Sequence, residues 1–282
     1  MATSPRRTNL KPPGKCIFCD RTGSLSKEHI WAEWLEQIVP QTADSHRIQS
    51  YKVRFADSED TGVTHRQGPL HHRKIRNVCE TCNNGWMSRL EEKDAAPILT
   101  PMILGQDVLL REQELKILVR WLVKTSIMIS CLYPPMMIKK IDCHRIRRLR
   151  RPPLTWQIFI GFNPECAGQF ASHWTRTHLS LSPPRVSTDP PGNLASLFWG
   201  VGQLICLAVI SYVDGNQFRL NPMGDGEHRM VQIWPVKEIE IRWPPAHTLS
   251  TADMVSYGYA LQRLIHRIAQ EVFPRKPPSS PG

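Results

Sequence analysis

Four cysteines stand in two short pairs in the first third of the chain, and their spacing is typical of a metal site. Cys16 and Cys19 form the first pair and Cys79 and Cys82 the second, with two residues between the members of each pair. A CxxC pair places two thiolates on one tight turn, and two such turns supply the four sulfur ligands that tetrahedral zinc prefers. We therefore predict a structural Zn²⁺ ion bound by these four cysteines.

The long separation of the two pairs does not weaken this prediction. Extending a closed loop from about 15 to about 60 residues costs roughly 1.2 kcal/mol, because the closure entropy grows only logarithmically. A structural zinc ion contributes on the order of 10 kcal/mol. A redox CxxC is typical of a βαβ context, which this sequence lacks. Disulfides are disfavoured because residues 1–15 contain no apolar secretory segment, so we expect a cytoplasmic protein.

Further residues with chemical potential lie close to the cysteine pairs. Glu28 and His29 are adjacent and stand between the two pairs, and Asn83 directly follows the second pair. The order CxxC, Glu-His, CxxCN resembles the zinc-stapled HNH endonucleases of the ββα-metal (His-Me finger) group, including phage junction-resolving nucleases. The stretch CNNGWMSRLE, from Cys82 to Glu91, is also similar to a subfamily of HNH-like proteins. The resemblance covers about the first third of the chain.

The resemblance implies a metal-dependent endonuclease that hydrolyses phosphodiester bonds in DNA, or in RNA, and leaves a 3′ hydroxyl and a 5′ phosphate. It assigns His29 as the general base that takes a proton from water, a role that a neutral imidazole can perform near pH 7. It assigns Glu28 and Asn83 as ligands of a catalytic Mg²⁺ or Mn²⁺ ion. Both offer oxygen atoms, which hard divalent cations prefer.

The local backbone must meet a condition before these residues can share one site. Neighbours on a regular strand point to opposite faces, so Glu28 and His29 can face one ion only if the strand twists or bulges. Asn83 is expected at the start of a helix, where Asn84 is an alternative ligand. Asn77 is the only candidate for the middle asparagine of the motif. Without catalysis, His29 would be a partly exposed histidine at the start of a helix, beside two tryptophans whose rings pack the module.

The charge of the chain favours a polyanionic partner. The net charge is +11 and the isoelectric point is near 9.5. A basic stretch contains a single acid, Asp142, and is either a phosphate-binding surface or a solvated basic loop. We predict that its basic residues bind a nucleic-acid backbone: Lys139, Lys140, Arg145, Arg147, Arg148, Arg150 and Arg151. No membrane partner is expected, because the most apolar run, 115–133, carries Lys116, Arg120 and Lys124 as a polar stripe.

The helices and strands that must position these residues are expected in an order that predicts an α+β protein. A flexible basic arm, 1–15, precedes a zinc-bound HNH-like module, 16–95. An α+β domain of unknown role, 96–273, has a mostly antiparallel sheet with flanking helices, and a disordered tail, 274–282, follows. The expected elements are helices at 112–133 and 252–272, strands at 155–162, 177–182 and 203–213, and a hairpin formed by 230–235 and 238–243.

Two other functions are compatible with the same sequence. The first is a zinc-dependent nucleic-acid-binding protein without catalytic activity, which the unclear middle asparagine favours. The second is a structural or interaction protein in which zinc only staples a small lobe to a partner-binding domain. Binding and cleavage of nucleic acid distinguish these functions from the nuclease.

Overall fold

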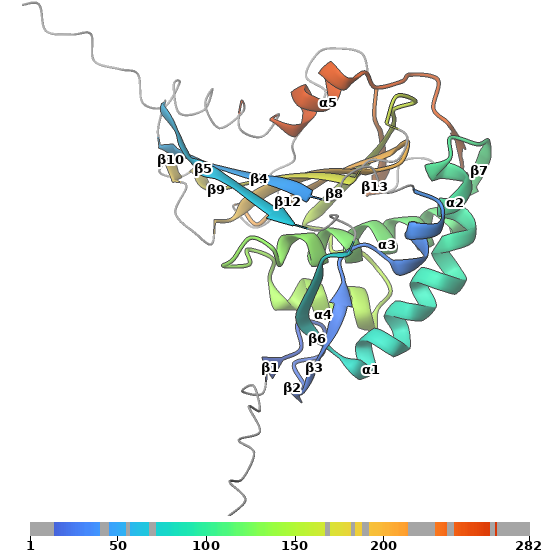
Figure 1. Ribbon diagram of the computed structural model, residues 1–282, viewed down its shortest axis with the longest axis horizontal. Coiled ribbons are helices and arrows are strands. Elements are labelled where there is room, and N and C mark those ends of the chain that lie inside the picture. The colour runs from blue at the N-terminus through green and yellow to red at the C-terminus, as the bar shows by residue number, and fades with distance from the viewer. Residues whose placement is uncertain are drawn as a thin grey trace, which may run out of the picture.

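The computed structural model describes residues 14–39, 72–166, 192–213, 229–235, 240–259 and Arg263, together with the strands at 45–54, 57–67, 170–181 and 184–187. The chain adopts the predicted α+β class, with antiparallel sheets and helices that are not arranged in a βαβ repeat (Figure 1). The predicted tail lies outside the described residues. So does the predicted arm, apart from Gly14 and Lys15.

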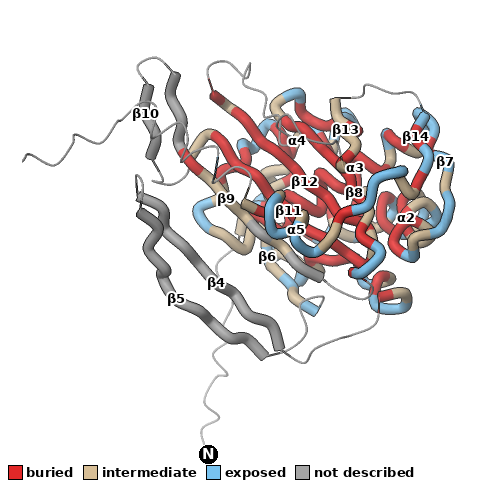
Figure 2. The backbone as a smooth tube through the Cα atoms, turned by 90° about the horizontal axis from the view of Figure 1, so that it is seen from above, coloured by how far each residue is buried: buried red, intermediate tan, exposed pale blue. Residues whose placement is uncertain are grey.

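A six-stranded antiparallel sheet forms the centre of the molecule, with the strand order β10-β9-β11-β12-β8-β13. Every residue of β11 and β12 is buried, which explains why the sequence of β12 is continuously apolar. Figure 2 shows β11, β12 and β8 coloured as buried along most of their length. The strands are β8 (Trp156–Phe162), β9 (Phe170–Leu181), β10 (Pro184–Ser187), β11 (Leu194–Val201), β12 (Leu204–Ser211) and β13 (Val231–Trp234).

Helices cover both faces of this sheet. The long helix α3 (Glu112–Ser130) lies against one face with α2 (Ala96–Ile103) and α4 (Lys140–Arg148), and α5 (Thr251–Gly258) lies on the other (Figure 1). Alternate side chains of each strand serve the two faces. In β8, Ile158 and Ile160 belong to the larger core beside α3, whereas Phe159 belongs to the smaller core beneath α5.

The predicted helices and strands of residues 112–133, 155–162 and 203–213 are confirmed, but the predicted hairpin is wrong. Strand β13 pairs with β8, whereas β14 (Glu240–Trp243) pairs with β7 (Val108–Arg111) in a separate two-stranded sheet. Alternating polarity identifies a strand and its buried face but not its partner, so the sequence could not show that the two strands part. The closing helix is described only from Thr251 to Gly258.

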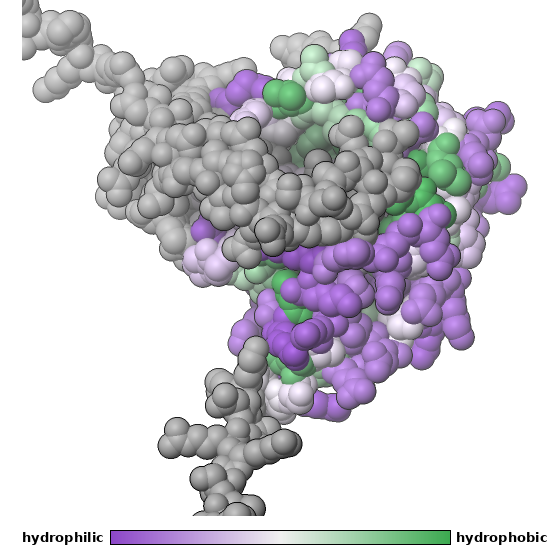
Figure 3. All heavy atoms as spheres, in the orientation of Figure 1, coloured by the Kyte–Doolittle hydropathy of each residue, from purple (hydrophilic) through white to green (hydrophobic). Residues whose placement is uncertain are grey.

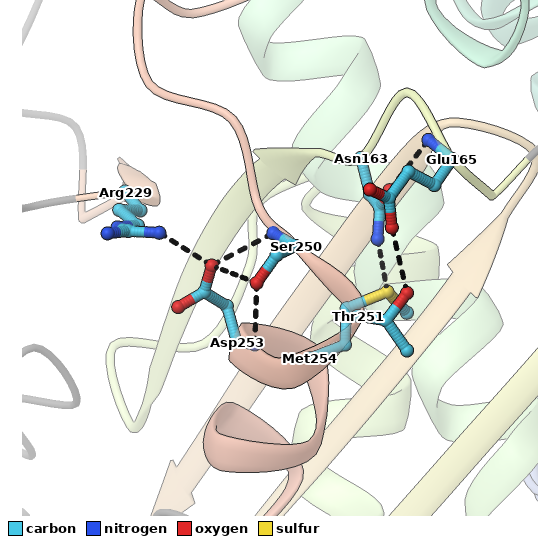
Figure 4. A network of polar contacts seen from close by, with 7 residues as sticks. All are labelled: Asn163, Glu165, Arg229, Ser250, Thr251, Asp253 and Met254. Carbon is cyan, nitrogen blue, oxygen red and sulfur yellow. Dashed lines mark hydrogen bonds and ion pairs between the residues drawn. The ribbon is translucent and has the colours of Figure 1, made fainter.

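Helix α5 is fixed to the sheet by a polar network at its N-terminus (Figure 4). The Ser250 hydroxyl accepts a hydrogen bond from the Asp253 amide at 3.2 Å, and the Asp253 carboxylate accepts one from the Ser250 amide at 2.8 Å. This reciprocal arrangement is a capping box. Arg229 donates to the same carboxylate at 2.6 Å, and the Thr251 hydroxyl donates to Glu165 after β8 at 3.0 Å.

The cysteine-bearing segment is built from short elements that end in one long helical run. The hairpin of β1 (Gly14–Lys15) and β2 (Thr22–Gly23) precedes β3 (Leu25–His29), which pairs with β6 (Lys74–Cys79). Between them lie η1 (Glu33–Gln37) and the paired strands β4 (Ser45–Arg54) and β5 (Asp57–Gln67). The helical run then consists of α1 (Glu80–Cys82), the π-helical segments η3 (Asn83–Met87) and η4 (Arg89–Ala95), and α2.

The cysteine-bearing segment and the sheet share one hydrophobic core. The Trp199 ring on β11 lies 5.3 Å from Trp31 and 5.8 Å from Trp121 on α3, measured between ring centres. The proposed boundary between 95 and 96 falls inside the helical run, where η4 continues directly into α2. The two segments are therefore packed together without a linker between them.

No helix among the described residues combines the length and apolar character needed to cross a membrane. Two of the three cations in the polar stripe of α3 are buried. Lys124 is fully buried and Arg120 is 8% exposed, whereas Lys116 is exposed and pairs with Glu112. Both buried cations contact the helical run that follows the second cysteine pair.

Candidate metal centre and adjoining pocket

The four predicted cysteine ligands meet at one point. Their sulfur atoms all lie within 4.8 Å of one another, and three of the four residues are buried. Backbone contacts support the same arrangement, since the Ile17 amide donates to the Asn77 carbonyl oxygen at 2.9 Å. The Arg21 guanidinium also donates to the Thr81 hydroxyl at 2.8 Å. A four-sulfur cluster of this kind could hold a metal ion such as zinc.

The protonation of the cluster also suits metal binding. A hydrogen bond from the Cys82 thiol lowers the pKa of Cys16 to about 4, and the same contact raises the pKa of Cys82 above its ordinary value. One thiolate is therefore favoured before any ion is bound. Binding of a metal ion would release the protons of the remaining thiols.

Beside the cysteine cluster lies an open pocket of about 620 Å³, into which the predicted site residues converge. The register of the β3–β6 ladder shifts between Ser26 and Glu28, where two residues of β6 stand opposite one residue of β3. The extra residue belongs to β6 and the shift lies before Glu28, so Glu28 and His29 themselves stay in regular register with Ile75 and Lys74. Both residues nevertheless line the pocket. The pocket is lined by Glu28 and His29 of β3 and by Asn83 and Asn84 of η3, together with Lys27, Lys74, Trp34 and Glu91.

Glu28 lies at the back of the pocket and is 5% exposed. Burial raises the pKa of its carboxyl to about 7, although the nearby Lys124 ammonium and a hydrogen bond from Asn83 oppose this rise. Asn83 also donates from Nδ2 to the Ser26 hydroxyl at 3.3 Å. Because Nδ2 makes these contacts, the side-chain oxygen of Asn83 is the atom suited to a cation.

His29 is half-buried at the mouth of the pocket, opposite Lys74 in the strand register. Burial lowers the pKa of its imidazole, and the positive charge of Lys74 lowers it further. Its Nδ1 atom lies 4.0 Å from the Glu33 carboxylate. The imidazole is therefore neutral near pH 7, which is the form that can accept a proton.

The two remaining asparagine candidates differ in position. Asn84 lines the pocket beside Asn83. Asn77 lies next to the Cys131 thiol at the end of α3; burial raises the pKa of that thiol to about 11, and a hydrogen bond with Asn77 opposes the rise. Asn77 therefore does not occupy the position that a middle asparagine of the motif would need.

The helix after the second cysteine pair is held by apolar contacts. Met87 and Leu90 are buried, and the Trp86 ring packs edge-on against Phe18 of the first cysteine turn at 5.1 Å. The Arg120 guanidinium lies over the Trp86 ring, 5.1 Å from its centre. This packing fixes the start of the helix that carries Asn83.

The pocket offers few protein ligands for a divalent ion, so water or substrate would have to complete the coordination. Among the described residues, the four cysteines are the only group of three or more His, Cys, Asp or Glu side chains whose ligand atoms converge within 4.8 Å. Glu28 and Asn83 offer two oxygen donors. Mg²⁺ usually takes few protein ligands and keeps several waters, so this donor set fits the ion.

Charged residues in or next to the pocket also lie outside the sequence-based assignment. Glu91 lines the pocket two helical turns after Asn83, and Lys124 of α3 forms an ion pair with it. Lys74 stands across the ladder from His29. The period of the helical run could have indicated Glu91, and the polar stripe of α3 could have indicated Lys124.

The basic stretch is a helix for most of its length. Its only acid, Asp142, attaches this helix to the central sheet through hydrogen bonds. Asp142 of α4 is buried and accepts hydrogen bonds from Thr155 at 3.1 Å, Trp156 at 3.2 Å and Tyr212 at 2.6 Å. On the same helix, His144 lies 3.0 Å from Asp20 in the first cysteine turn. Residues 140–148 are therefore a docked helix and not a loop, and nothing here decides between a phosphate-binding surface and a solvated one.

Most of the predicted phosphate-binding residues are exposed. Lys139, Lys140, Arg145, Arg148, Arg150 and Arg151 are exposed, and Arg147 is half-buried. Figure 3 shows hydrophilic side chains gathered over the lower part of the molecule, where α1, β3 and β6 lie in Figure 1. Whether the basic residues bind nucleic acid stays a prediction.

Comparisons with family models, with curated proteins and with solved structures found no match to this chain. The resemblance to the HNH endonucleases therefore stays an interpretation of the motif. The functional argument depends on the geometry of the pocket and on the cysteine cluster.

Proposed function

We propose that this protein is a metal-dependent HNH-like endonuclease that hydrolyses phosphodiester bonds in DNA. The observation that carries the proposal is the convergence of His29, Glu28 and Asn83 in one pocket beside the four cysteines. His29 and Asn83 are 54 positions apart in the chain, and the resemblance assigns both to such a site.

Each residue has a distinct task in the proposed reaction. His29 is neutral near pH 7 and takes a proton from the attacking water. The Glu28 carboxylate and the Asn83 side-chain oxygen would hold a Mg²⁺ or Mn²⁺ ion, which when bound supplies positive charge for the reacting phosphate. The cysteine cluster, with zinc bound, would keep β3 and the helical run at their present separation.

Positive charge at the rim of the pocket supports a phosphate-bearing substrate. Lys27 and Lys74 line the pocket on the strand side, close to His29. They are suited to bind the phosphates on either side of the cleaved bond, while the basic residues of 139–151 contact the backbone farther along. Such contacts give affinity that falls steeply with salt and carries little sequence information.

The proposal is tested by incubating supercoiled plasmid with the purified protein and Mg²⁺ or Mn²⁺. We expect nicking by the wild type and a loss of at least a hundredfold in the His29→Ala variant, because general-base catalysis typically contributes that much or more. The matched control is His72→Ala, since His72 is exposed and lies 3.4 Å from Glu36 rather than in the pocket.

Equal nicking by the wild type and His29→Ala would exclude His29 as the base. Absence of nicking in all variants, combined with salt-sensitive DNA binding, would favour the second candidate, a zinc-dependent nucleic-acid-binding protein without catalysis. The docked basic helix α4, which contacts the first cysteine turn through Asp20, is the observation that supports this second candidate.

A further inference from the structure

A buried ion pair joins the pocket to the segment after residue 95. The Lys124 ammonium on α3 is fully buried and pairs with the Glu91 carboxylate on η4, which is 8% exposed. Lys124 belongs to the central helix that covers the sheet, whereas Glu91 lines the pocket. The pair therefore connects the long helix to the floor of the candidate site.

Fold stability alone is a weak explanation for this pair. Transferring two charges out of water costs several kcal/mol per ion, and replacing a buried ion pair with apolar residues of similar size is often neutral or stabilising. One turn away from Lys124 on α3, Trp121, Ile127 and Met128 are buried apolar side chains, and Arg120 is the one buried cation among these neighbours. An apolar side chain at position 124 would extend the apolar part of this surface.

The pair lies beside a second carboxylate. Lys124 and Glu91 are both electrostatic neighbours of Glu28, which is itself buried at the back of the pocket. Two carboxylates repel one another at close range in a site of low dielectric constant. The buried Lys124 ammonium pairs with Glu91 and also acts on Glu28, so it offsets this repulsion and both carboxylates can stay in place before a cation arrives.

We propose that Lys124 is a positioning residue of the candidate active site: through its ion pair it holds the Glu91 carboxylate at the pocket floor beside Glu28, and so preorganises the pocket for a divalent cation. The inference depends on the proposed function and deepens it. Helix α3 would then position a side chain of the candidate site in addition to packing against the sheet. Sites whose groups are held in place before binding lose less free energy to rearrangement.

The experiment removes the ion pair without leaving an unpaired buried charge. Lys124→Met/Glu91→Leu replaces both partners with apolar side chains, and Glu112→Gln/Lys116→Met removes an exposed ion pair from the same helix as a matched control. Mn²⁺ binding is measured by electron paramagnetic resonance, alongside zinc content, thermal midpoint and plasmid nicking. We expect the buried double variant to keep its zinc and its fold but to bind Mn²⁺ at least tenfold more weakly, while the control is unchanged.

A folded buried double variant with a Mn²⁺ dissociation constant within twofold of the wild type would overturn the inference. If that variant does not fold, Glu91→Asp decides the question, because it keeps the charge pair but withdraws the carboxylate by one methylene group. Weakened Mn²⁺ binding in this variant supports the inference, and unchanged binding overturns it. If the wild type binds no Mn²⁺ and does not nick DNA, the proposed function has failed, and the inference fails with it.

Discussion

The sulfur atoms of Cys19 and Cys79 lie 3.6 Å apart, although the two residues are sixty positions apart in the chain. This contact brings the first cysteine turn against the start of the helical run. The helical run then carries Asn83, which directly follows Cys82, to the pocket.

The purified protein is expected to contain one zinc ion per chain, bound by the four cysteines. Cys79→Ser should lose the zinc and lower the thermal midpoint strongly, since structural zinc contributes on the order of 10 kcal/mol. Metal analysis and thermal unfolding measure both effects. As a control, Cys206→Ala alters a buried thiol of β12 and should leave the zinc content at one. Full zinc content in Cys79→Ser would contradict the assignment.

Binding of a divalent ion should weaken as the pH falls from 8 to 6. The pKa of Glu28 is raised to about 7, so at pH 6 most of the carboxyl is protonated and competes with the ion. A single group of this kind predicts a roughly tenfold rise in the Mn²⁺ dissociation constant between pH 8 and pH 6. A constant affinity over this range would show that Glu28 is not a ligand.

Glu28→Gln should stabilise the fold at high pH. The folded state holds the Glu28 proton more tightly than the unfolded state, whose ordinary pKa is 4.5, so wild-type stability falls as the pH rises from 4.5 through about 7. The rise of the Glu28 pKa from 4.5 to about 7 corresponds to a loss of about 3 kcal/mol of folding free energy once the carboxyl is ionised. Urea unfolding of both proteins should therefore show an advantage for Glu28→Gln that grows from pH 5 to pH 8. An advantage independent of pH would contradict the burial argument.

Lys74→Ala should weaken DNA binding and reduce its salt dependence. Measured in the His29→Ala background, where cleavage is prevented, the slope of log affinity against log salt should fall by about 0.9 for the loss of one phosphate contact to duplex DNA. Lys116→Ala is the control, because Lys116 is exposed on α3 and already pairs with Glu112. Identical slopes for the two variants would remove Lys74 from the substrate contacts.

Asp142→Ala should destabilise the protein by about 3 kcal/mol, because it leaves buried donors such as the Trp156 indole and the Tyr212 hydroxyl without their acceptor. Urea unfolding measures this loss. Asp107→Ala, at an exposed position, should change the stability by no more than about 0.5 kcal/mol. A similar result for both variants would mean that Asp142 does not anchor α4.

Several features could be predicted from local sequence because local physics controls them. The period of apolar residues identified α3, β8 and β12, since one buried face imposes its own spacing on a helix or strand. The two CxxC pairs identified the metal centre, because four sulfurs at such spacings suit one tetrahedral ion. The motif around Glu28, His29 and Asn83 identified residues that the structure brings to one pocket.

Other features were decided by tertiary structure. The separation of β13 from β14 depends on which strand each one meets, and alternating polarity does not encode the partner. In the sequence Asp142 is a single acid in a basic run, and only the structure shows that it is buried and anchors α4. In the sequence Lys124 is part of a polar stripe, and only the packing of α3 against η4 pairs it with Glu91. Sequence periodicity shows which side chains are buried together, whereas the identity of a distant partner depends on how whole elements pack.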